Sequence, residues 1–279
     1  QHYDAPYILK DFPRRVVTLP ISEDGNVNFC IGASLLGIKP VYDIIGGDFL
    51  FRAMDSICNT LAKSNFVTGI QRTVVIRTET LLGGPTTGQR LESFFVHVPG
   101  LRVAVPSTPR DAYGLMRAAL ATPGVTLLFE DRMIQDVGPF IPEDLLLGES
   151  VPFGKVSMRK YGERGQPLIL TYGIMRQVVE RALEPWRGVR LLDLRTIYPI
   201  DWETLRWCMS RHNRILIVEP DITYGGVGAE IAATLAQEFV GVQIKRLGAP
   251  MATIPAAMSL HSQMMPSEEA ILEAITGEW

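Results

Sequence analysis

The chain has 279 residues, 27 basic and 30 acidic side chains, and a formal net charge of -3. This near balance excludes the clustered basic excess that nucleic-acid-binding proteins need, and no apolar run approaches the roughly 20 residues of a membrane-spanning helix. Only 20% of the residues are charged and 47% are apolar, which excludes a disordered chain and suffices for one large or two ordinary domains.

Three cysteines, Cys30, Cys58 and Cys208, are widely spaced and form no metal-binding pair. Their small number predicts a reducing compartment, and we therefore expect a cytoplasmic protein. The first residue is glutamine rather than methionine, and no signal-like segment follows it, so we expect the numbering to begin inside a longer polypeptide.

Five short apolar runs in the first half of the chain predict strands at residues 16–19, 41–45, 73–77, 102–105 and 126–129. Such continuous runs are typical of the interior strands of a parallel sheet that is covered on both faces. Amphipathic stretches between them predict helices at about residues 24–36, 48–63 and 109–121. The last of these begins with Thr108 and Pro109, a residue able to cap a helix followed by proline at the first helical position.

Residues 138–167 interrupt this alternation, because they are rich in proline, glycine and charge and show no sustained period. We interpret them as the connection between two domains, with some extended structure of its own. Beyond them, strands are predicted at residues 168–172, 189–194, 214–218 and 242–247, and helices at residues 174–183, 201–210, 227–239 and 267–275. Alternating strands and helices imply right-handed crossovers. We therefore predict an α/β protein of two doubly wound parallel-sheet domains, residues 1–145 and 146–279.

Self-contained catalytic motifs are missing from the sequence: it has no phosphate loop, no metal-binding helix and no nucleophile elbow, so no metal site is predicted within this chain. The segment from Gly225 to Gly228 follows a predicted strand and opens a predicted helix, as a phosphate-binding turn does. Ile231 replaces the third glycine of a dinucleotide fingerprint. The favoured interpretation is therefore a tight turn packed at an interface, with a bound phosphate as the alternative.

Residues 20–25 read PISEDG and directly follow the first predicted strand. In one interpretation Ser22 caps the next helix, with Glu23 and Asp24 in a first turn where carboxylates offset the helix dipole. In the other, Glu23 sits at the carboxyl end of a parallel strand, where open sheets place their ligands. Burial there would raise the pKa of its carboxyl group and let it share a proton with a ligand nitrogen. Spacing alone leaves both interpretations open.

Longer segments resemble a known family. PISEDG, HVPGLRVAVPSTPRDA and LLDLRTIYPIDWETL are similar, in this order, to the β subunit of the thiamine-diphosphate-dependent decarboxylase component of 2-oxo acid dehydrogenase complexes, and the resemblance covers residues 16–274. It implies a transketolase-like pyrimidine-binding domain followed by a transketolase C-terminal domain. It also implies that Glu23 hydrogen-bonds the aminopyrimidine ring of thiamine diphosphate and so promotes deprotonation of the thiazolium carbon. The cofactor is then the electron sink for cleavage of a 2-oxo acid or a ketose.

The resemblance also implies partners. The family holds the diphosphate through Mg²⁺ on a GDG-containing motif that this sequence lacks, so an α-type subunit is expected to carry that site in an α2β2 assembly. The acyl or two-carbon unit is expected to pass to a lipoyl or phosphopantetheinyl carrier protein. Two alternatives stay open: a ketol-transferase subunit of the split-transketolase type in a specialised pathway, and a non-catalytic scaffold or docking subunit.

Three positions depart from the family pattern. Thr87 stands where a substrate-facing histidine is expected, and threonine can donate a hydrogen bond but cannot shuttle a proton as imidazole does near neutral pH. Gly46 replaces an aromatic residue beside the pyrimidine, a gap that Phe49 or Phe51 could fill. Residues 121–124 replace a monovalent-cation loop, which puts that ion site in doubt. The predicted catalytic residues are Glu23 and Thr87, and the predicted cofactor-binding residues are Glu23, Gly46 and Phe49.

Overall fold

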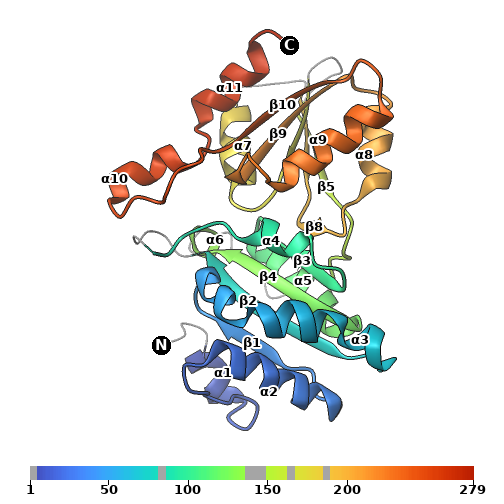
Figure 1. Cartoon of the computed structure of the whole chain (residues 1–279). Helices are drawn as coiled ribbons and strands as arrows, with labels where there is room; N and C mark the ends of the chain where they lie inside the picture. The colour runs from blue at the N-terminus through green and yellow to red at the C-terminus, as the bar shows by residue number, and fades with distance from the viewer. Residues whose placement is uncertain (1–4, 81–85, 136–148, 162–166, 185–188) are drawn as a thin grey trace.

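The computed structural model describes residues 5–80, 86–135, 149–161, 167–184 and 189–279. Two five-stranded sheets, each covered by helices on both faces, lie one above the other in Figure 1. We call the parts built on them the first and the second domain. None of the helices in the described ranges is long and apolar enough to cross a membrane.

The first sheet has the strand order β1-β2-β4-β3-β8. Four strands run parallel, namely β1 (Val41–Ile44), β2 (Thr73–Thr80), β3 (Leu101–Ala104) and β4 (Gly124–Asp131). The fifth, β8 (Thr196–Tyr198), comes from far along the chain and pairs antiparallel with β3. One face packs against α2 (Glu23–Leu35), the 3-10 helix η1 (Gly47–Ala53), the π-helix η2 (Ser56–Leu61) and α3 (Ala62–Thr68); the other packs against α5 (Pro109–Ala121).

The second sheet has the strand order β10-β9-β6-β7-β5. Its parallel strands are β6 (Leu168–Thr171), β7 (Val189–Asp193), β9 (Arg214–Ile222) and β10 (Gln243–Ala249), and β5 (Ser157–Tyr161) is an antiparallel edge strand. Helices α7 (Met175–Leu183) and α11 (Glu268–Thr276) cover one face, and α8 (Trp202–Met209) and α9 (Val227–Glu238) cover the other. Shorter helices are α1 (Ala5–Asp11), α4 (Glu92–Val96), α6 (Arg132–Gln135), α10 (Met258–His261) and η4 (Ser262–Met264).

The predicted fold class is confirmed, with the addition that each sheet carries one antiparallel edge strand. The strand predicted at residues 16–19 is wrong: these residues have no sheet assignment, and Val17 is 64% exposed. An apolar run forms a strand only where a neighbouring edge pairs with it and buries its side chains. The expected domain boundary between residues 145 and 146 lies outside the described residues.

One continuous core joins the two domains. It runs from the face of the first sheet under α2 to the face of the second sheet under α8 and α9. Val103 and Val105 of the first domain belong to the same buried cluster as Leu192 and Leu194 of the second. Removal of this apolar surface from water therefore stabilises the two domains against each other as well as each one internally.

Candidate functional site

The carboxyl ends of β1, β2 and β4 meet at one edge of the first sheet (Figure 1). Helix α2 leads back to the start of β1, so its first turn lies at the same edge. Open parallel sheets place their ligands in the crevice outside the carboxyl ends of the strands. Glu23 begins α2, Gly46 follows β1 and Thr87 follows β2, so three of the sequence-predicted residues belong to this edge.

Glu23 is half-buried as the first residue of α2. Ser22 occupies the capping position, but its side chain makes no capping hydrogen bond, so that part of the structural interpretation is wrong. Burial raises the pKa of the Tyr42 phenol on β1, and the negative charge of Glu23 adds to that rise. Within the described part of the chain, the Glu23 carboxylate has no hydrogen-bond partner. A free carboxylate at this edge fits the donor groups of an aminopyrimidine.

Side-chain hydrogen bonds hold the start of α2 against the sheet. The Asn26 amide donates to the Pro20 carbonyl oxygen at 2.9 Å and to the Tyr42 hydroxyl at 3.1 Å. The Ser56 hydroxyl on η2 donates to Asp24 Oδ1 at 2.5 Å. The backbone that carries Glu23 is therefore tied to both β1 and η2, which keeps the residue at this edge of the sheet.

The structure brings the Gly46 loop and the Thr87 segment together. Gly46 is buried in an extended conformation just before η1. Two residues later, Asp48 accepts hydrogen bonds from the Gly88 backbone N–H at 2.9 Å and from Gln89 Nε2 at 3.0 Å. Asp48 thereby holds the two residues that directly follow Thr87. Thr87 itself is partly exposed and lines a cavity.

The two phenylalanines of η1 differ in their surroundings. Phe49 is 38% exposed and does not line that cavity among the described residues. Phe51 meets Phe94 of α4 edge to face, with ring centroids 5.4 Å apart, and Phe94 does line the cavity. A cofactor contact of Phe49 stays a prediction.

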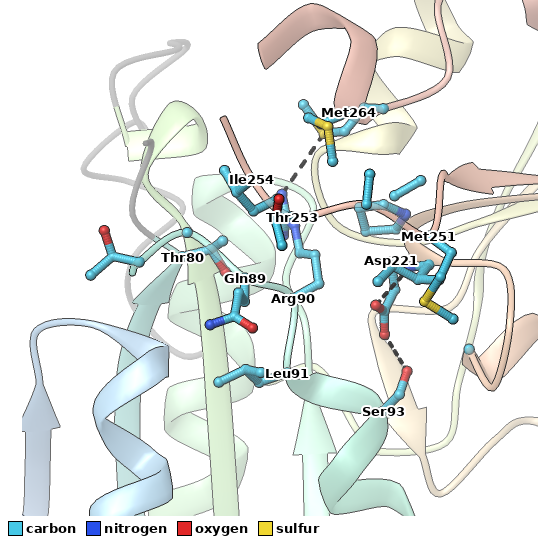
Figure 2. A pocket seen from close by; sticks show the side chains of 18 of the residues that line it. Thr80, Gln89, Arg90, Leu91, Ser93, Asp221, Met251, Thr253, Ile254 and Met264 are labelled. Atoms are coloured by element: carbon cyan, nitrogen blue, oxygen red, sulfur yellow. Dashed lines mark hydrogen bonds between the residues drawn. The ribbon is translucent and has the colours of Figure 1, made fainter. Parts of the chain in front are cut away.

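The cavity has a volume of about 740 Å³ and lies between the two domains (Figure 2). Thr87, Arg90 and Asp131 belong to its first-domain wall, and Asp221, Met251 and Met265 belong to its second-domain wall. Among the described lining residues, Thr87 is the only one of the four sequence-predicted positions, since Glu23, Gly46 and Phe49 lie elsewhere on the same domain.

Charged groups in this cavity are paired across short distances. Arg90 Nη2 donates to Asp131 Oδ1 at 2.5 Å, while Asp131 Oδ2 accepts from the backbone N–H of Ile174 in the second domain at 3.1 Å. The Ser93 hydroxyl donates to Asp221 across the domain boundary, as the dashed line in Figure 2 marks. Burial raises the pKa of Asp221, and its hydrogen bond with Ser93 opposes that rise.

Sequence reasoning missed Arg90, Asp131 and Asp221. The partners in these pairs lie between 41 and 128 residues apart in the chain, so no local motif joins them. One signal was available: Asp131 lies two residues after the predicted strand at 126–129, at the end where parallel sheets carry ligands.

The contacts of the turn from Gly225 to Gly228 favour a packed turn over a phosphate-binding turn. The buried Glu219 carboxylate accepts a hydrogen bond from the Gly228 backbone N–H at 2.8 Å and another from Arg246 Nη2 at 2.7 Å. A protein carboxylate thus occupies the start of α9, where a phosphate would bind. A Cβ atom on Gly226 or Gly228 would lie within 2.7 Å of a Glu219 oxygen, so these glycines make room for that side chain.

Among the described residues, no group of three or more histidine, cysteine, aspartate or glutamate side chains is placed to hold a metal ion.

Residues 4–135 match the transketolase pyrimidine-binding domain, and residues 156–271 match the transketolase C-terminal domain. The chain belongs to the transketolase family. The resemblance and the two-domain architecture indicated by the sequence motifs are thereby confirmed.

Relatives of this chain include several β subunits. It is 28% identical over 281 residues to the pyruvate dehydrogenase E1 component subunit beta of Rickettsia felis, covering 96% of this chain and 85% of that protein. It is 27% identical to the acetoin:2,6-dichlorophenolindophenol oxidoreductase subunit beta (95% and 80% covered) and 28% identical to the 2-oxoisovalerate dehydrogenase subunit beta (94% and 83% covered), both of Bacillus subtilis. A solved split-gene transketolase, described as an inactive beta4 tetramer, shares the fold with a TM-score of 0.82 at 19% identity, over 98% of this chain and 86% of that one.

Proposed function

We propose that this chain is the β-type subunit of a thiamine-diphosphate-dependent enzyme that cleaves a 2-oxo acid or a ketose. The position of Glu23 carries the proposal: its carboxylate is free of hydrogen-bond partners in the described chain and begins α2 at the carboxyl edge of a pyrimidine-binding domain. The β subunits among its relatives support the same role. When bound, the cofactor supplies a nucleophilic carbon and an electron sink.

The residues of this chain would bind and orient that cofactor. Glu23 would accept a hydrogen bond from the aminopyrimidine ring and hold a proton there, while Asn26 keeps the loop before α2 in place. Gly46 and Phe49 would flank the ring from the adjoining loop. The Thr87 hydroxyl would donate a hydrogen bond to the substrate but cannot replace imidazole as a proton shuttle near neutral pH.

We further propose that an α-type subunit holds the diphosphate and Mg²⁺, in an α2β2 assembly. The product unit would pass to a lipoyl or phosphopantetheinyl carrier protein. The cysteine usage of the chain supports a cytoplasmic location. The replacement of the expected histidine by Thr87 favours a second candidate, a ketol-transferase subunit of the split-transketolase type, and a non-catalytic scaffold is the third.

The variant Glu23→Gln tests the proposal. We expect it to lower kcat at least about 100-fold, the lower end of what general acid–base groups contribute. The assay uses the co-purified complex with Mg²⁺ and thiamine diphosphate, offered pyruvate, a branched 2-oxo acid and xylulose 5-phosphate in turn. Asp24→Asn is the matched control, because it neutralises the next carboxylate of the same turn and keeps the acceptor for Ser56.

Full cofactor-dependent turnover by the Glu23→Gln complex removes the catalytic role of this residue. A wild-type complex that binds the cofactor and cleaves none of the three substrates supports the scaffold instead. Turnover of xylulose 5-phosphate alone selects the ketol transferase.

A further inference from the structure

The cavity between the domains has the size of a small-molecule site. Its volume of about 740 Å³ falls inside the range of roughly 300–1,000 Å³ that ligand pockets occupy. Figure 2 shows Arg90 and Gln89 on the first-domain side and Asp221 and Met251 opposite them. Thr87 and Gly88 belong to the lining, so the cavity reaches the segment that Asp48 ties to the Gly46 loop.

Apolar side chains form most of the second-domain wall. They come from the end of β9 and from the segment that runs from the end of β10 to η4, and they include Ile222, Ala249, Met251, Ile254, Met264 and Met265. Methionine is unbranched and polarizable, so a methionine-rich wall can adapt to apolar groups of different shape. Leu91 and Phe94 continue this surface on the first-domain side. The wall therefore favours an apolar ligand over a polar one.

The charges of the lining work against a ligand that places a phosphate group in the cavity. Arg90 is the one arginine or lysine among the described lining residues, and its guanidinium is neutralised by Asp131 at 2.5 Å. Asp221 adds a second carboxylate, so two carboxylates face one guanidinium in the lining. His261 Nε2 is held by the Pro255 carbonyl oxygen at 2.8 Å. A phosphate group would meet an excess of negative charge and no unpaired cation in this part of the chain.

We propose that this cavity binds the apolar side chain of a bulky 2-oxo acid, a medium-length aliphatic or an aryl chain, and that it excludes phosphorylated sugars. The inference rests on the proposed function and narrows its substrate class. The reacting carbonyl would stay at the Thr87 end, next to the loop where the cofactor is expected. The chain would extend past Leu91 toward the wall of Met251, Met264 and Met265, where burial of its apolar surface is the source of binding energy.

A binding experiment tests the cavity without turnover. The purified full chain is titrated with N-phenyl-1-naphthylamine, an uncharged apolar probe that fluoresces when it leaves water. We expect saturable binding that 2-oxooctanoate and phenylpyruvate reverse and that inorganic phosphate and xylulose 5-phosphate leave unchanged.

Ala252 is an exposed residue of the lining, and Ala252→Trp places a large side chain in the cavity. We expect this variant to bind the probe at least tenfold more weakly than the wild type. Ala233→Trp is the matched control, because Ala233 is exposed on α9 and does not line the cavity. Unsaturable binding, or equal binding by both variants, overturns the inference.

A second experiment measures substrate preference in the complex with the α-type subunit. We expect the ratio of kcat/KM for 2-oxooctanoate to that for pyruvate to fall at least tenfold in Ala252→Trp and to stay unchanged in Ala233→Trp. An unchanged ratio in Ala252→Trp overturns the inference.

The two experiments separate the two failures. If the complex cleaves pyruvate and the chain does not bind the probe, the cavity assignment is wrong and the proposed function stands. If the probe binds in the cavity and no 2-oxo acid or ketose is cleaved, the proposed function is wrong and, with it, the assignment of the cavity to a 2-oxo acid.

Discussion

Glu92 is a buried side chain near the boundary between the two domains, and its surroundings change its pKa. It begins α4, its side chain is 0% exposed, and its Oε2 accepts a hydrogen bond from the Leu91 backbone N–H at 3.0 Å. Burial raises the pKa of Glu92 to about 7; Arg90 opposes the rise, and Asp221 and Asp131 add to it. The folded chain therefore keeps this proton at pH values where the unfolded chain has lost it.

The consequence is a loss of stability as the pH rises. A glutamate in an unfolded chain titrates near pH 4.3, so between that pH and about 7 the folded state binds one more proton than the unfolded state. The contribution of Glu92 to the free energy of unfolding is fully present below the lower value and disappears as the pH passes through the upper one.

Glu92→Gln should remove this dependence, because glutamine resembles the protonated acid and keeps an acceptor for the Leu91 N–H. Between pH 5 and pH 8, we expect the free energy of unfolding of the variant to rise by about 2 kcal/mol relative to that of the wild type. Urea unfolding at the two pH values measures this difference. Glu273→Gln, an exposed change on α11, is the control and should follow the wild-type curve. Parallel curves for Glu92→Gln and the wild type would show that Glu92 is ionised at both pH values in the folded chain.

Among the elements, α5 was predicted with its observed bounds. The Thr108 hydroxyl accepts from the Asp111 backbone N–H, and Pro109 occupies the first turn, as the sequence indicates. The start of α5 can be predicted from the local sequence because the capping threonine and the proline lie next to each other in the chain. The other end depends on a distant residue: Arg102 of β3 donates to the Thr122 and Pro123 carbonyl oxygens at 2.9 Å each.

These carbonyl oxygens belong to residues 121–124, where the family resemblance puts a monovalent-cation site in doubt. The guanidinium of Arg102 supplies a positive charge there, beside the negative end of the helix dipole, and it also lies over the Phe153 ring at 4.8 Å. Burial lowers the pKa of Arg102, as expected for a cation removed from water.

Arg102→Met should therefore lower the free energy of unfolding by about 1–3 kcal/mol, because it leaves two carbonyl oxygens without their charged donor. We also expect the melting temperature of the wild type to be the same in potassium and in N-methylglucamine salts of equal ionic strength. Arg117→Met, on the exposed side of α5, is the matched control. A wild-type protein stabilised specifically by potassium would contradict the assignment of Arg102 to this loop.

Other elements show where local pattern fails. The helix predicted at residues 48–63 is divided into the 3-10 helix η1, the π-helix η2 and the start of α3. The strand β8 has three residues and was not predicted, because its pairing with the distant strand β3, not its own composition, makes it a strand. The same dependence on an edge explains why residues 16–19 do not form a strand. Hydrophobic period predicts what a segment can become, and the available neighbour decides the outcome.

At the scale of the whole molecule, sequence predicts those parts of the candidate site that lie within one short stretch of the chain. Glu23 and Thr87 could be predicted as site residues because each lies in a recognisable stretch of sequence, and their roles stay predictions. The contacts of Asp48 with Gly88 and of Ser93 with Asp221 join residues 40 and 128 positions apart. Such pairs depend on the placement of two domains, which follows from the sum of many weak packing contacts rather than from a motif.

A buried ion network also joins the domains. Arg176 Nη1 on α7 lies 2.9 Å from Asp193 Oδ2 and 3.4 Å from Asp111 Oδ2 on α5 of the first domain. Ser107 of the first domain donates to Asp193 at 2.7 Å. Burial raises the pKa of Asp193 to about 6, and Asp111 adds to the rise while Arg176 opposes it. The Arg176 guanidinium thus forms an ion pair with one carboxylate of each domain.

Arg176→Met should lower the free energy of unfolding by about 3–5 kcal/mol, because two buried carboxylates lose their shared cation. The double variant Arg176→Met with Asp193→Asn should recover part of this loss, since it also removes one stranded charge. All four tryptophans, at positions 186, 202, 207 and 279, lie in the second half of the chain, so their fluorescence follows the second domain while circular dichroism follows both. We expect the two signals to coincide in the wild type and to separate in Arg176→Met. Coincident transitions in the single variant would mean that the shared apolar core couples the domains without the ion network.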